Sequence, residues 1–288
     1  MRQGHKPIFF QMPGRNASNE PSPILLPFGN ESALCGRGYQ RMANSSSFDR
    51  RKFIKVCVGA SAAVAASPAL IAKPAGELVP AERVRLVDAD GQTLHPGSLA
   101  IGESYVFHYP YVTTPCFLID LGSPAEPGAE LTTEDGRSYR WSGGVGPGRS
   151  VVAFSAICAH RMSYPTRTVS FIDYRHEPMS ASSTNSGWWN RGKVIYCCSE
   201  GSVYDPHDGA RVLSGPAPQP LAAVHLDYDP DEQALFATGV YGGSMLKRFL
   251  TEFGFQVELA HKRDDIRRPA SDATVVWPMS EYSRTGAC

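Results

Sequence analysis

The chain has 288 residues with 28 basic and 28 acidic side chains, so its formal net charge at pH 7 is zero. Without a basic stripe or a net positive charge, nothing in the composition favours binding to nucleic acid. Its seven cysteines follow no regular spacing, which excludes a small disulfide-rich scaffold.

The first 41 residues do not have the pattern of a folded domain. They carry Pro, Gly, Asn and Ser in no regular order, which does not favour a packed core. They also precede a segment that is typical of the start of an exported protein. We therefore expect 1–41 to be a disordered or an untranslated extension, with Met42 as the true start.

Residues 42–76 resemble a twin-arginine export signal. Arg50 and Arg51 are followed by Lys52 and Phe53, and then by a weakly apolar run over 56–72 that is rich in small residues. That export route carries folded proteins, which suits a cofactor inserted in the cytoplasm. We expect a location on the periplasmic side of a bacterial inner membrane. The segment is either cut off or kept as a short membrane tether.

Downstream, short β-branched and aromatic runs are separated by Gly, Pro and Asp turn signals. About 210 residues of this kind suit one domain or a small domain with an insertion. The pattern predicts an all-β fold. The expected strands cover 84–87, 105–109, 117–121, 151–156, 194–197, 224–228 and 234–238.

Two cysteine segments carry the chemistry. The first reads Cys158-Ala159-His160. The second begins with Cys197-Cys198 and ends with an aromatic–Asp pair and a proline at 204–206. A Gly-Pro-Ala-Pro stretch follows at 215–218. Thiolates and imidazoles in two such segments are the ligands of an iron–sulfur centre in which one iron has cysteine ligands and the other has histidine ligands.

These segments resemble the Rieske subunits of bacterial quinol-oxidising cytochrome bc complexes over about half of the mature chain. The resemblance implies an antiparallel β-sandwich base formed by 77–150 and 222–242, with a small cluster-binding β subdomain, 151–221, inserted between them. The whole Rieske domain would then cover 77–242. The resemblance also implies a [2Fe–2S] cluster held by Cys158, His160 and either Cys198 or Cys197.

One ligand of the family pattern, Cys-x-His followed by Cys-x-x-His-Gly, is missing, because no histidine stands three residues after either second cysteine. In one register Cys197 is the ligand and Glu200 occupies the histidine position. In the other, Cys198 is the ligand and Gly201 stands at the lost position. The fourth ligand could be Glu200, or His207 from the same loop, or the cluster could be absent.

The resemblance also implies a disulfide between the two ligand loops that this chain cannot form. Ser163 stands where the family has the first cysteine, and Ser199 or Glu200 stands at the second position. Of the remaining candidate residues, Cys116 is expected to pack in an apolar strand. Apart from the possible use of His207 as the fourth ligand, His207 and His225 are expected to be a loop residue and a strand residue without function.

A polar excursion over 162–193, much longer than usual between the ligand loops, closes on two tryptophans at 188–189 and could cover the cluster or contact a partner. Residues 244–253 have apolar side chains at helical spacing, and 262–288 read as a loosely held polar tail. The expected C-terminal unit, 243–288, is thus a helix and a tail.

The resemblance implies an exported electron-transfer protein that relays single electrons to a cytochrome or an oxidoreductase subunit, as in a quinol–cytochrome c reductase-like complex. A quinol is a further candidate partner, although His160 alone would have to contact it. The alternative is a cluster-free accessory subunit that uses the Rieske fold to bind a partner protein. The sequence shows no nucleophile constellation and no mononuclear-iron domain of the kind that hydrolases or Rieske oxygenases need.

Overall fold

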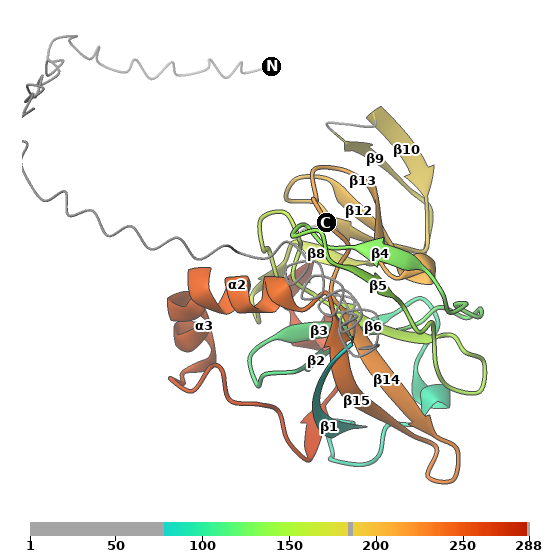
Figure 1. Cartoon of the computed structure of the whole chain (residues 1–288), viewed down its shortest axis with the longest axis vertical. Helices are drawn as coiled ribbons and strands as arrows, with labels where there is room; N and C mark the ends of the chain where they lie inside the picture. Colours follow the sequence, from blue (N-terminus) through green and yellow to red (C-terminus); the bar gives the residue numbers. More distant parts are fainter. Residues whose placement is uncertain (1–77, 184–186, 287–288) are drawn as a thin grey trace, which may run out of the picture. The chain divides into compact units, whose positions relative to one another are not determined.

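In the computed structural model, the described residues are 78–183 and 187–286, and strands dominate them (Figure 1). The strands are β1 (Val79–Val87), β2 (Ser104–His108), β3 (Pro115–Asp120), β4 (Glu130–Thr132), β5 (Ser138–Arg140), β6 (Val151–Ser155), β7 (Val169–Ser170), β8 (Ile172–Arg175), β9 (Met179–Ser183), β10 (Gly187–Arg191), β11 (Val194–Cys197), β12 (Ser202–Asp205), β13 (Arg211–Ser214), β14 (Ala223–Asp229), β15 (Ala234–Tyr241), β16 (Ala273–Val275), β17 (Trp277–Pro278) and β18 (Thr285–Gly286). The helical elements are η2 (Pro96–Ser98), η3 (Pro206–Asp208), α2 (Ser244–Glu252), α3 (Gly254–His261) and α4 (Met279–Tyr282). The predicted all-β fold class is confirmed.

The larger sheet forms the base of the fold. Its eight strands follow the order β16-β1-β15-β14-β6-β3-β2-β17. The β1–β16 pair is parallel, and the other pairs are antiparallel. β6 is buried along its whole length and β3 at all but its last residue, as expected of short apolar runs in the centre of a sheet.

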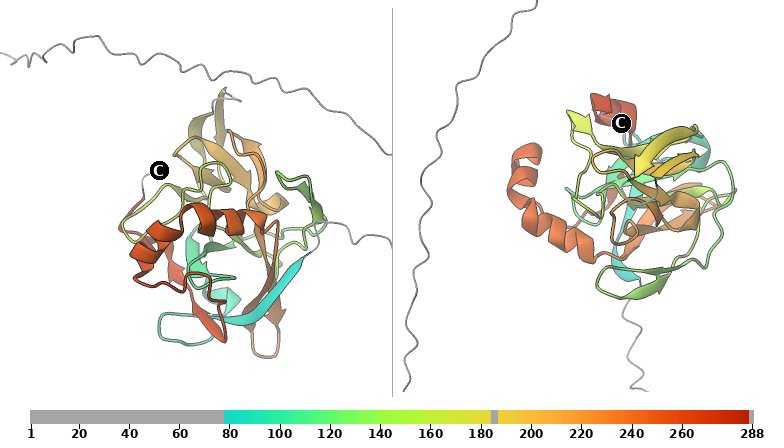
Figure 2. Two further views of the ribbon diagram at one scale, coloured as in Figure 1. Left: turned by 60° about the vertical axis from the view of Figure 1, so that its left-hand side comes forward. Right: turned by 90° about the horizontal axis from the view of Figure 1, so that it is seen from above.

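A second, four-stranded antiparallel sheet, in the order β13-β12-β11-β8, carries the second cysteine segment. In Figure 1 it lies above the base sheet, with the β9–β10 hairpin beyond it, and the left view of Figure 2 shows the same arrangement. β11 and β12 form a hairpin whose turn begins directly after Cys197. The first cysteine segment instead leaves the end of β6 in the base sheet. The two segments thus come from different sheets.

Three details of the predicted organisation differ from the structure. Residues Val151–Ser155, expected in the inserted subdomain, pair with β3 and β14 in the base sheet. The 162–193 excursion, expected as a loop, contains β7, β8, β9 and β10. The 262–288 tail, expected to be loosely held, adds β16, β17 and β18 to the edges of β1, β2 and β7. Strands of two or three residues are too short to show a periodic pattern in the sequence. Their extended conformation comes from pairing with the edge of a neighbouring strand.

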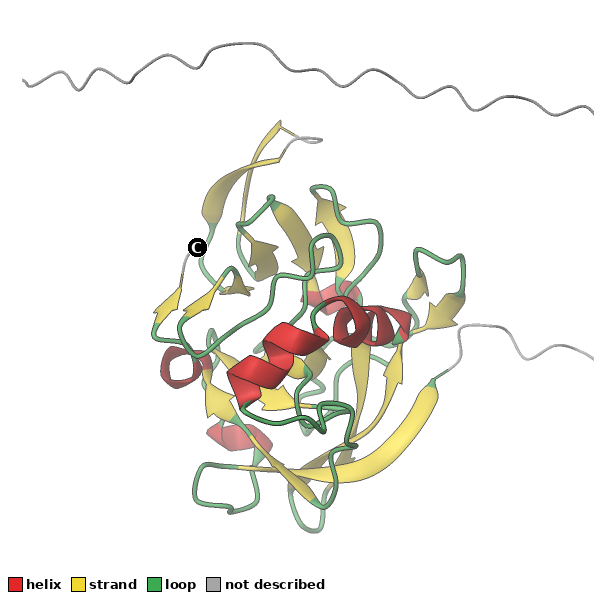
Figure 3. Ribbon diagram, turned by 90° about the vertical axis from the view of Figure 1, so that its left-hand side faces the viewer, coloured by secondary structure: helices red, strands yellow, loops and turns green. Residues whose placement is uncertain are grey.

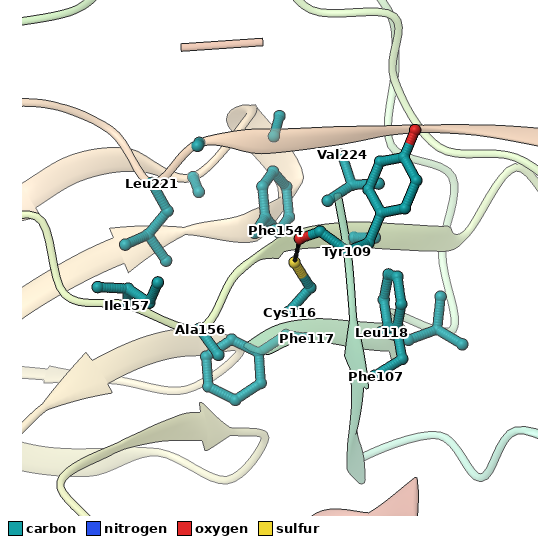
Figure 4. Packing of buried hydrophobic residues seen from close by; sticks show 14 of the residues in the cluster. Phe107, Tyr109, Cys116, Phe117, Leu118, Phe154, Ala156, Ile157, Leu221 and Val224 are labelled. Atoms are coloured by element: carbon teal, nitrogen blue, oxygen red, sulfur yellow. Dashed lines mark hydrogen bonds between the residues drawn. The ribbon is translucent and has the colours of Figure 1, made fainter. Parts of the chain in front are cut away.

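The core lies where the base sheet is most apolar. Phe107, Phe117 and Phe154 are fully buried there. Figure 4 shows Cys116 among these side chains, with its Sγ 3.1 Å from the carbonyl oxygen of Tyr109. Burial raises the pKa of the Cys116 thiol, since the thiolate would lose its solvation. The expectation that Cys116 is a packing residue agrees with this position.

Helices α2 and α3 cover one side of the strands, and Figure 3 shows them, in red, across the front of the molecule. The apolar stripe predicted over 244–253 is buried at Met245, Leu246, Phe249 and Leu250. The ring of Phe249 lies 4.9 Å from that of Tyr164, between centroids, in an edge-to-face arrangement. This contact links the helix to the segment that follows the first cysteine loop.

The predictions for 1–41 and for the export signal in 42–76 lie outside the described residues. So do the side chains at 188–189, the two tryptophans. Within the described ranges, no helix is both long enough and apolar enough to cross a membrane.

Candidate metal centre

The first cysteine loop is a tight turn at the end of β6. The N–H of Cys158 donates to the carbonyl of Ser163 at 2.9 Å, and the N–H of Met162 donates to the carbonyl of Cys158 at the same distance. Met162 adopts a left-handed backbone conformation with φ 57°. The turn buries the Cys158 side chain and leaves His160 partly exposed.

The second cysteine loop is the turn of the β11–β12 hairpin. Cys197 pairs with Ser202 across the hairpin, and the N–H of Gly201 donates to the carbonyl of Cys197 at 2.9 Å. Gly201 has φ +77°, a conformation that glycine adopts without strain and that a side chain disfavours. Cys197 is fully buried.

The two loops place the thiols of Cys158 and Cys197 close enough for each to shift the pKa of the other, and both cysteines are free. The interaction with Cys197 lowers the pKa of Cys158, and the Tyr204 hydroxyl and the backbone amides of His160 and Arg161 lower it further. The same interaction raises the pKa of Cys197, and burial adds to this effect. A lowered pKa favours the thiolate of Cys158, which is the form in which thiols bind iron.

Tyr204 supplies a polar contact that the sequence pattern did not reveal. Its Oη lies 3.3 Å from the Cys158 sulfur and accepts a hydrogen bond from the N–H of Ala159 at 3.1 Å. The side chain is fully buried, and burial raises the pKa of its phenol well above the usual value. Tyr204 therefore stays protonated and can donate to the sulfur.

His160 has a buried polar atom without a partner. Its Nδ1 is buried, and the described residues offer it no hydrogen-bond partner. A buried polar atom without a partner costs free energy, so it requires an explanation such as a bound ion. An imidazole nitrogen directed into the protein beside two cysteine loops has the chemistry of an iron ligand.

Glu200 and Arg161 form an ion pair between the two loops, with the guanidinium Nε 2.9 Å from Oε1 of the carboxylate. Each residue is the neighbour of a ligand candidate: Arg161 follows His160, and Glu200 stands three residues after Cys197. In the register with Cys197 as the ligand, the carboxylate stands at the second histidine position of the Rieske pattern, and Arg161 neutralises its charge.

Two features of the structure bear on the two registers left open by the sequence. Cys198 is disulfide-bonded, so its sulfur cannot serve as a thiolate ligand. Gly201, the alternative histidine position, has a left-handed backbone. Both observations favour the register in which Cys197 is the ligand and Glu200 replaces histidine.

His207, the other candidate for the fourth position, is engaged elsewhere. It lies in η3, its Nε2 is 3.0 Å from Ser123 Oγ, and its Nδ1 is 3.9 Å from a carboxylate oxygen of Asp205. Burial lowers the pKa of His207, with the Asp205 carboxylate opposing that shift. The hydrogen bond with Ser123 occupies Nε2, and Nδ1 faces the Asp205 carboxylate, which does not favour a role at the cysteine pair.

The Gly-Pro-Ala-Pro segment packs against the second loop. A Cβ added to Gly215 would lie 2.5 Å from the carbonyl oxygen of Gly201, far inside contact distance. Gly215 also has φ +91°. The glycine is thus required for close approach of two backbones, and it lets the proline segment cover the hairpin turn.

As a test of fit, these residues match a [2Fe–2S] cluster at three positions and depart from it at the fourth. Two free thiols and one unsatisfied imidazole nitrogen are present. However, no group of three or more His, Cys, Asp or Glu side chains within 78–183 and 187–286 is close enough together to hold a metal ion. The structure therefore brings the cysteine pair together, but it does not bring His160 or Glu200 into a complete ligand set.

No protein-family model matches the chain. Among solved structures, the chain is similar to the soluble domain of the Rieske protein II (soxF) from Sulfolobus acidocaldarius, with 28% sequence identity. The match covers 56% of this chain and 78% of that chain, with a TM-score of 0.38. Because the superposition is loose, the nature of the centre depends on the residues described above.

Proposed function

We propose that this protein is a Rieske-type iron–sulfur protein that relays single electrons. The observation that carries the proposal is the approach of the Cys158 and Cys197 thiols, which come from loops of different sheets and each accept hydrogen bonds from backbone amides. A lone buried cysteine packs as a small hydrophobe. Two that come together from separate loops, with an unsatisfied imidazole nitrogen two residues along the chain from Cys158, are better explained as ligands.

The chain's own residues would have distinct roles at such a centre. Cys158 and Cys197 would hold one iron and His160 the other, and the bound cluster would supply reversible one-electron transfer. Hydrogen bonds from the Tyr204 hydroxyl and the backbone amides reduce the charge on the sulfurs, which raises a reduction potential. Burial of the thiols excludes water from the cysteine side.

We further propose that Glu200 takes the place of the second histidine. A carboxylate is a harder and more anionic ligand than a neutral imidazole, so the potential should lie below that of a two-histidine centre. Arg161, 2.9 Å from the carboxylate, compensates part of this charge. With only His160 left as an imidazole, electron relay is better supported than quinol oxidation.

The twin-arginine pattern in 42–76 supports an exported protein on the periplasmic side of the inner membrane, either tethered or released. Its redox partner in that compartment would be a cytochrome or an oxidoreductase subunit, with a quinol as a further candidate.

A second function has an observation in its favour. In the described part of the chain, no three metal-binding side chains come together, and the only carboxylate at the histidine position pairs with Arg161. This arrangement also suits a cluster-free accessory subunit in which the fold binds a partner protein.

The deciding experiment is low-temperature EPR on freshly purified, dithionite-reduced protein, with iron and acid-labile sulfide counted on the same sample. We expect a reduced [2Fe–2S] signal and near-stoichiometric sulfide. Cys197→Ser should abolish both, whereas Cys198→Ser, its matched neighbour, should keep them. Glu200→His should shift the signal towards that of a two-histidine centre. A folded wild-type protein with neither signal nor sulfide would overturn this proposal and favour the accessory function.

A further inference from the structure

A cavity of about 720 Å³ lies between β1, the β4–β5 hairpin and the start of α2. None of the cysteines and histidines of the candidate metal centre is among its described lining residues. Pockets that hold small organic ligands measure about 300 to 1,000 Å³, so the space suits one such molecule. A ligand bound there would not depend on whether the cysteine pair holds iron.

Much of the cavity wall is apolar. Val79 and Pro80 contribute from β1, Val240 from β15 and Leu246 from α2. Although it is apolar, Val79 is 58% exposed. A ligand packed against it would remove hydrophobic surface from water, which favours binding. The occupant should therefore have an apolar body.

Tyr139 brings an unpartnered hydroxyl to this wall. Its side chain is only 4% exposed, and no hydrogen bond joins its Oη to another of the described residues. A Cβ added to Gly242, which also lines the cavity, would lie 3.6 Å from this oxygen. The ring stacks on that of Tyr241, 5.5 Å away between centroids, which fixes its direction. Burial raises the pKa of the phenol, so the hydroxyl is protonated and available as a donor.

Helix α2 begins at the cavity. Gly242, Gly243 and Ser244, which precede and start this nine-residue helix, belong to the lining. No described side chain caps its N-terminus, and its first turn has no acidic residue. The first N–H groups of a helix lack a partner within it, and the helix dipole adds a partial positive charge there. Together with the Tyr139 hydroxyl, this end of the cavity is suited to an anion.

Two cationic side chains, Arg137 and Lys247, also line the cavity. The guanidinium of Arg137 pairs with the Asp135 carboxylate at 2.5 Å. Lys247 makes no ion pair within the described residues. Its ammonium therefore leaves a positive charge in the first turn of α2 that an anionic ligand can balance.

Glu82, the one carboxylate among the described lining residues, stands apart from these donors. Val79 pairs with Val240, which leads into Gly242 and α2. Glu82 follows three residues further along β1, about 10 Å away at the rise of an extended strand. There, the Oη of Tyr109 donates to the Glu82 carbonyl at 3.1 Å. An anion at the start of α2 would thus avoid this carboxylate.

We propose that the cavity binds a medium-chain fatty acid, with its carboxylate at the N-terminus of α2 and its acyl chain along the apolar wall. The Tyr139 hydroxyl and the N–H groups of the first turn donate to the carboxylate, and Lys247 balances its charge. The acyl chain covers Val79 and contacts Leu246. An alcohol of the same length lacks the charge, and inorganic phosphate lacks the apolar body.

The test is isothermal titration calorimetry of the full-length protein with octanoate, with octanol and inorganic phosphate as matched probes. We expect saturable binding of one octanoate per chain. Octanol should bind about ten-fold more weakly, because its hydroxyl does not form charge-assisted hydrogen bonds. Phosphate should give no saturable signal. Absence of saturable octanoate binding, or equal affinity for octanol, would overturn the proposal.

A pair of tyrosine variants locates the carboxylate. Tyr139→Phe keeps the stacked ring and removes only the hydroxyl, so octanoate should bind about ten-fold more weakly while octanol affinity stays the same. Tyr241→Phe, which changes the other ring of the stack outside the described lining, should bind octanoate like the wild type. Circular dichroism spectra should be equal for all three proteins. Unchanged octanoate affinity in Tyr139→Phe would refute the proposed site.

A pair of charge variants separates a local contact from general electrostatics. Lys247→Gln should weaken octanoate binding several-fold. Arg248→Gln makes the same change in net charge one residue along, outside the described lining of this cavity, and should leave the affinity unchanged. If both variants weaken binding equally, the carboxylate is not bound beside Lys247 and the proposal fails.

Discussion

His108 should make folding stability fall as the pH is lowered. Its ring lies 5.3 Å from that of His261, between centroids, and its Nε2 is 3.2 Å from Tyr282 Oη, while the Arg167 guanidinium lies over the Tyr282 ring. Burial, followed by the charges of His261 and Arg167, lowers the pKa of His108 to about 3. The neutral ring is therefore the form that the folded protein accepts.

The sign follows from proton binding. Between pH 6.5 and about 3, the unfolded chain binds a proton at this histidine and the folded chain does not, so stability present above pH 6.5 is lost as the pH falls. If the folded protein leaves His108 unprotonated throughout, lowering the pH from 8 to 5 reduces the free energy of unfolding by about 2 kcal/mol. Because the His108 side chain keeps some contact with solvent, we expect a loss of about 1 to 2 kcal/mol in unfolding free energy.

The assay is urea unfolding of wild type and His108→Gln at pH 8 and at pH 5, followed by tryptophan fluorescence. At pH 8 the difference in unfolding free energy measures packing and the lost contact with Tyr282. At pH 5 the advantage of the wild type should be smaller by about 1 to 2 kcal/mol, since the variant has no ring to protonate. A difference that is the same at both pH values would refute the reasoning.

Three further substitutions test the packing and the site. Gly215→Ala places a Cβ against the Gly201 carbonyl at φ +91° and should cost about 2 kcal/mol or more; an unchanged melting temperature would contradict this. Tyr204→Phe removes the hydroxyl 3.3 Å from the Cys158 sulfur and should lower the midpoint potential in an EPR-monitored titration, with an equal potential as the contrary result. Phe249→Ala empties a fully buried position and should cost about 3 to 5 kcal/mol in urea unfolding; a loss below 1 kcal/mol would mean that the site collapses.

Much of the fold could be predicted because its central strands are apolar over their own length. The run at 151–156 and the run at 117–121 correspond to β6 and β3, and the helical stripe at 244–253 corresponds to α2. The edge strands could not be predicted. β17 and β18 have two residues each, and their conformation comes from the backbone groups of β2 and β7 that they pair with.

The candidate site was predictable where its chemistry lies in residue type and spacing. The two cysteine segments meet in the fold, with Cys158 close to Cys197, while iron binding by either stays a prediction. The choice between Cys197 and Cys198 could not be made from spacing, because adjacent cysteines fit either register. The backbone of Gly201 and the disulfide of Cys198 are the observations that favour Cys197. Tyr204 stood in a quoted motif, but only the fold shows that its hydroxyl reaches the first loop.

The ion pair between Glu200 and Arg161 contributes little to the stability of the fold. The Arg161 side chain is 65% exposed and that of Glu200 33%, and pairs of this kind contribute about 0 to 1 kcal/mol. The fold therefore gains little from it. If Glu200 takes the place of the second histidine, as we propose, an unpaired carboxylate would add a negative charge to the centre. Arg161, which follows His160 in the chain and pairs with Glu200, would offset that charge.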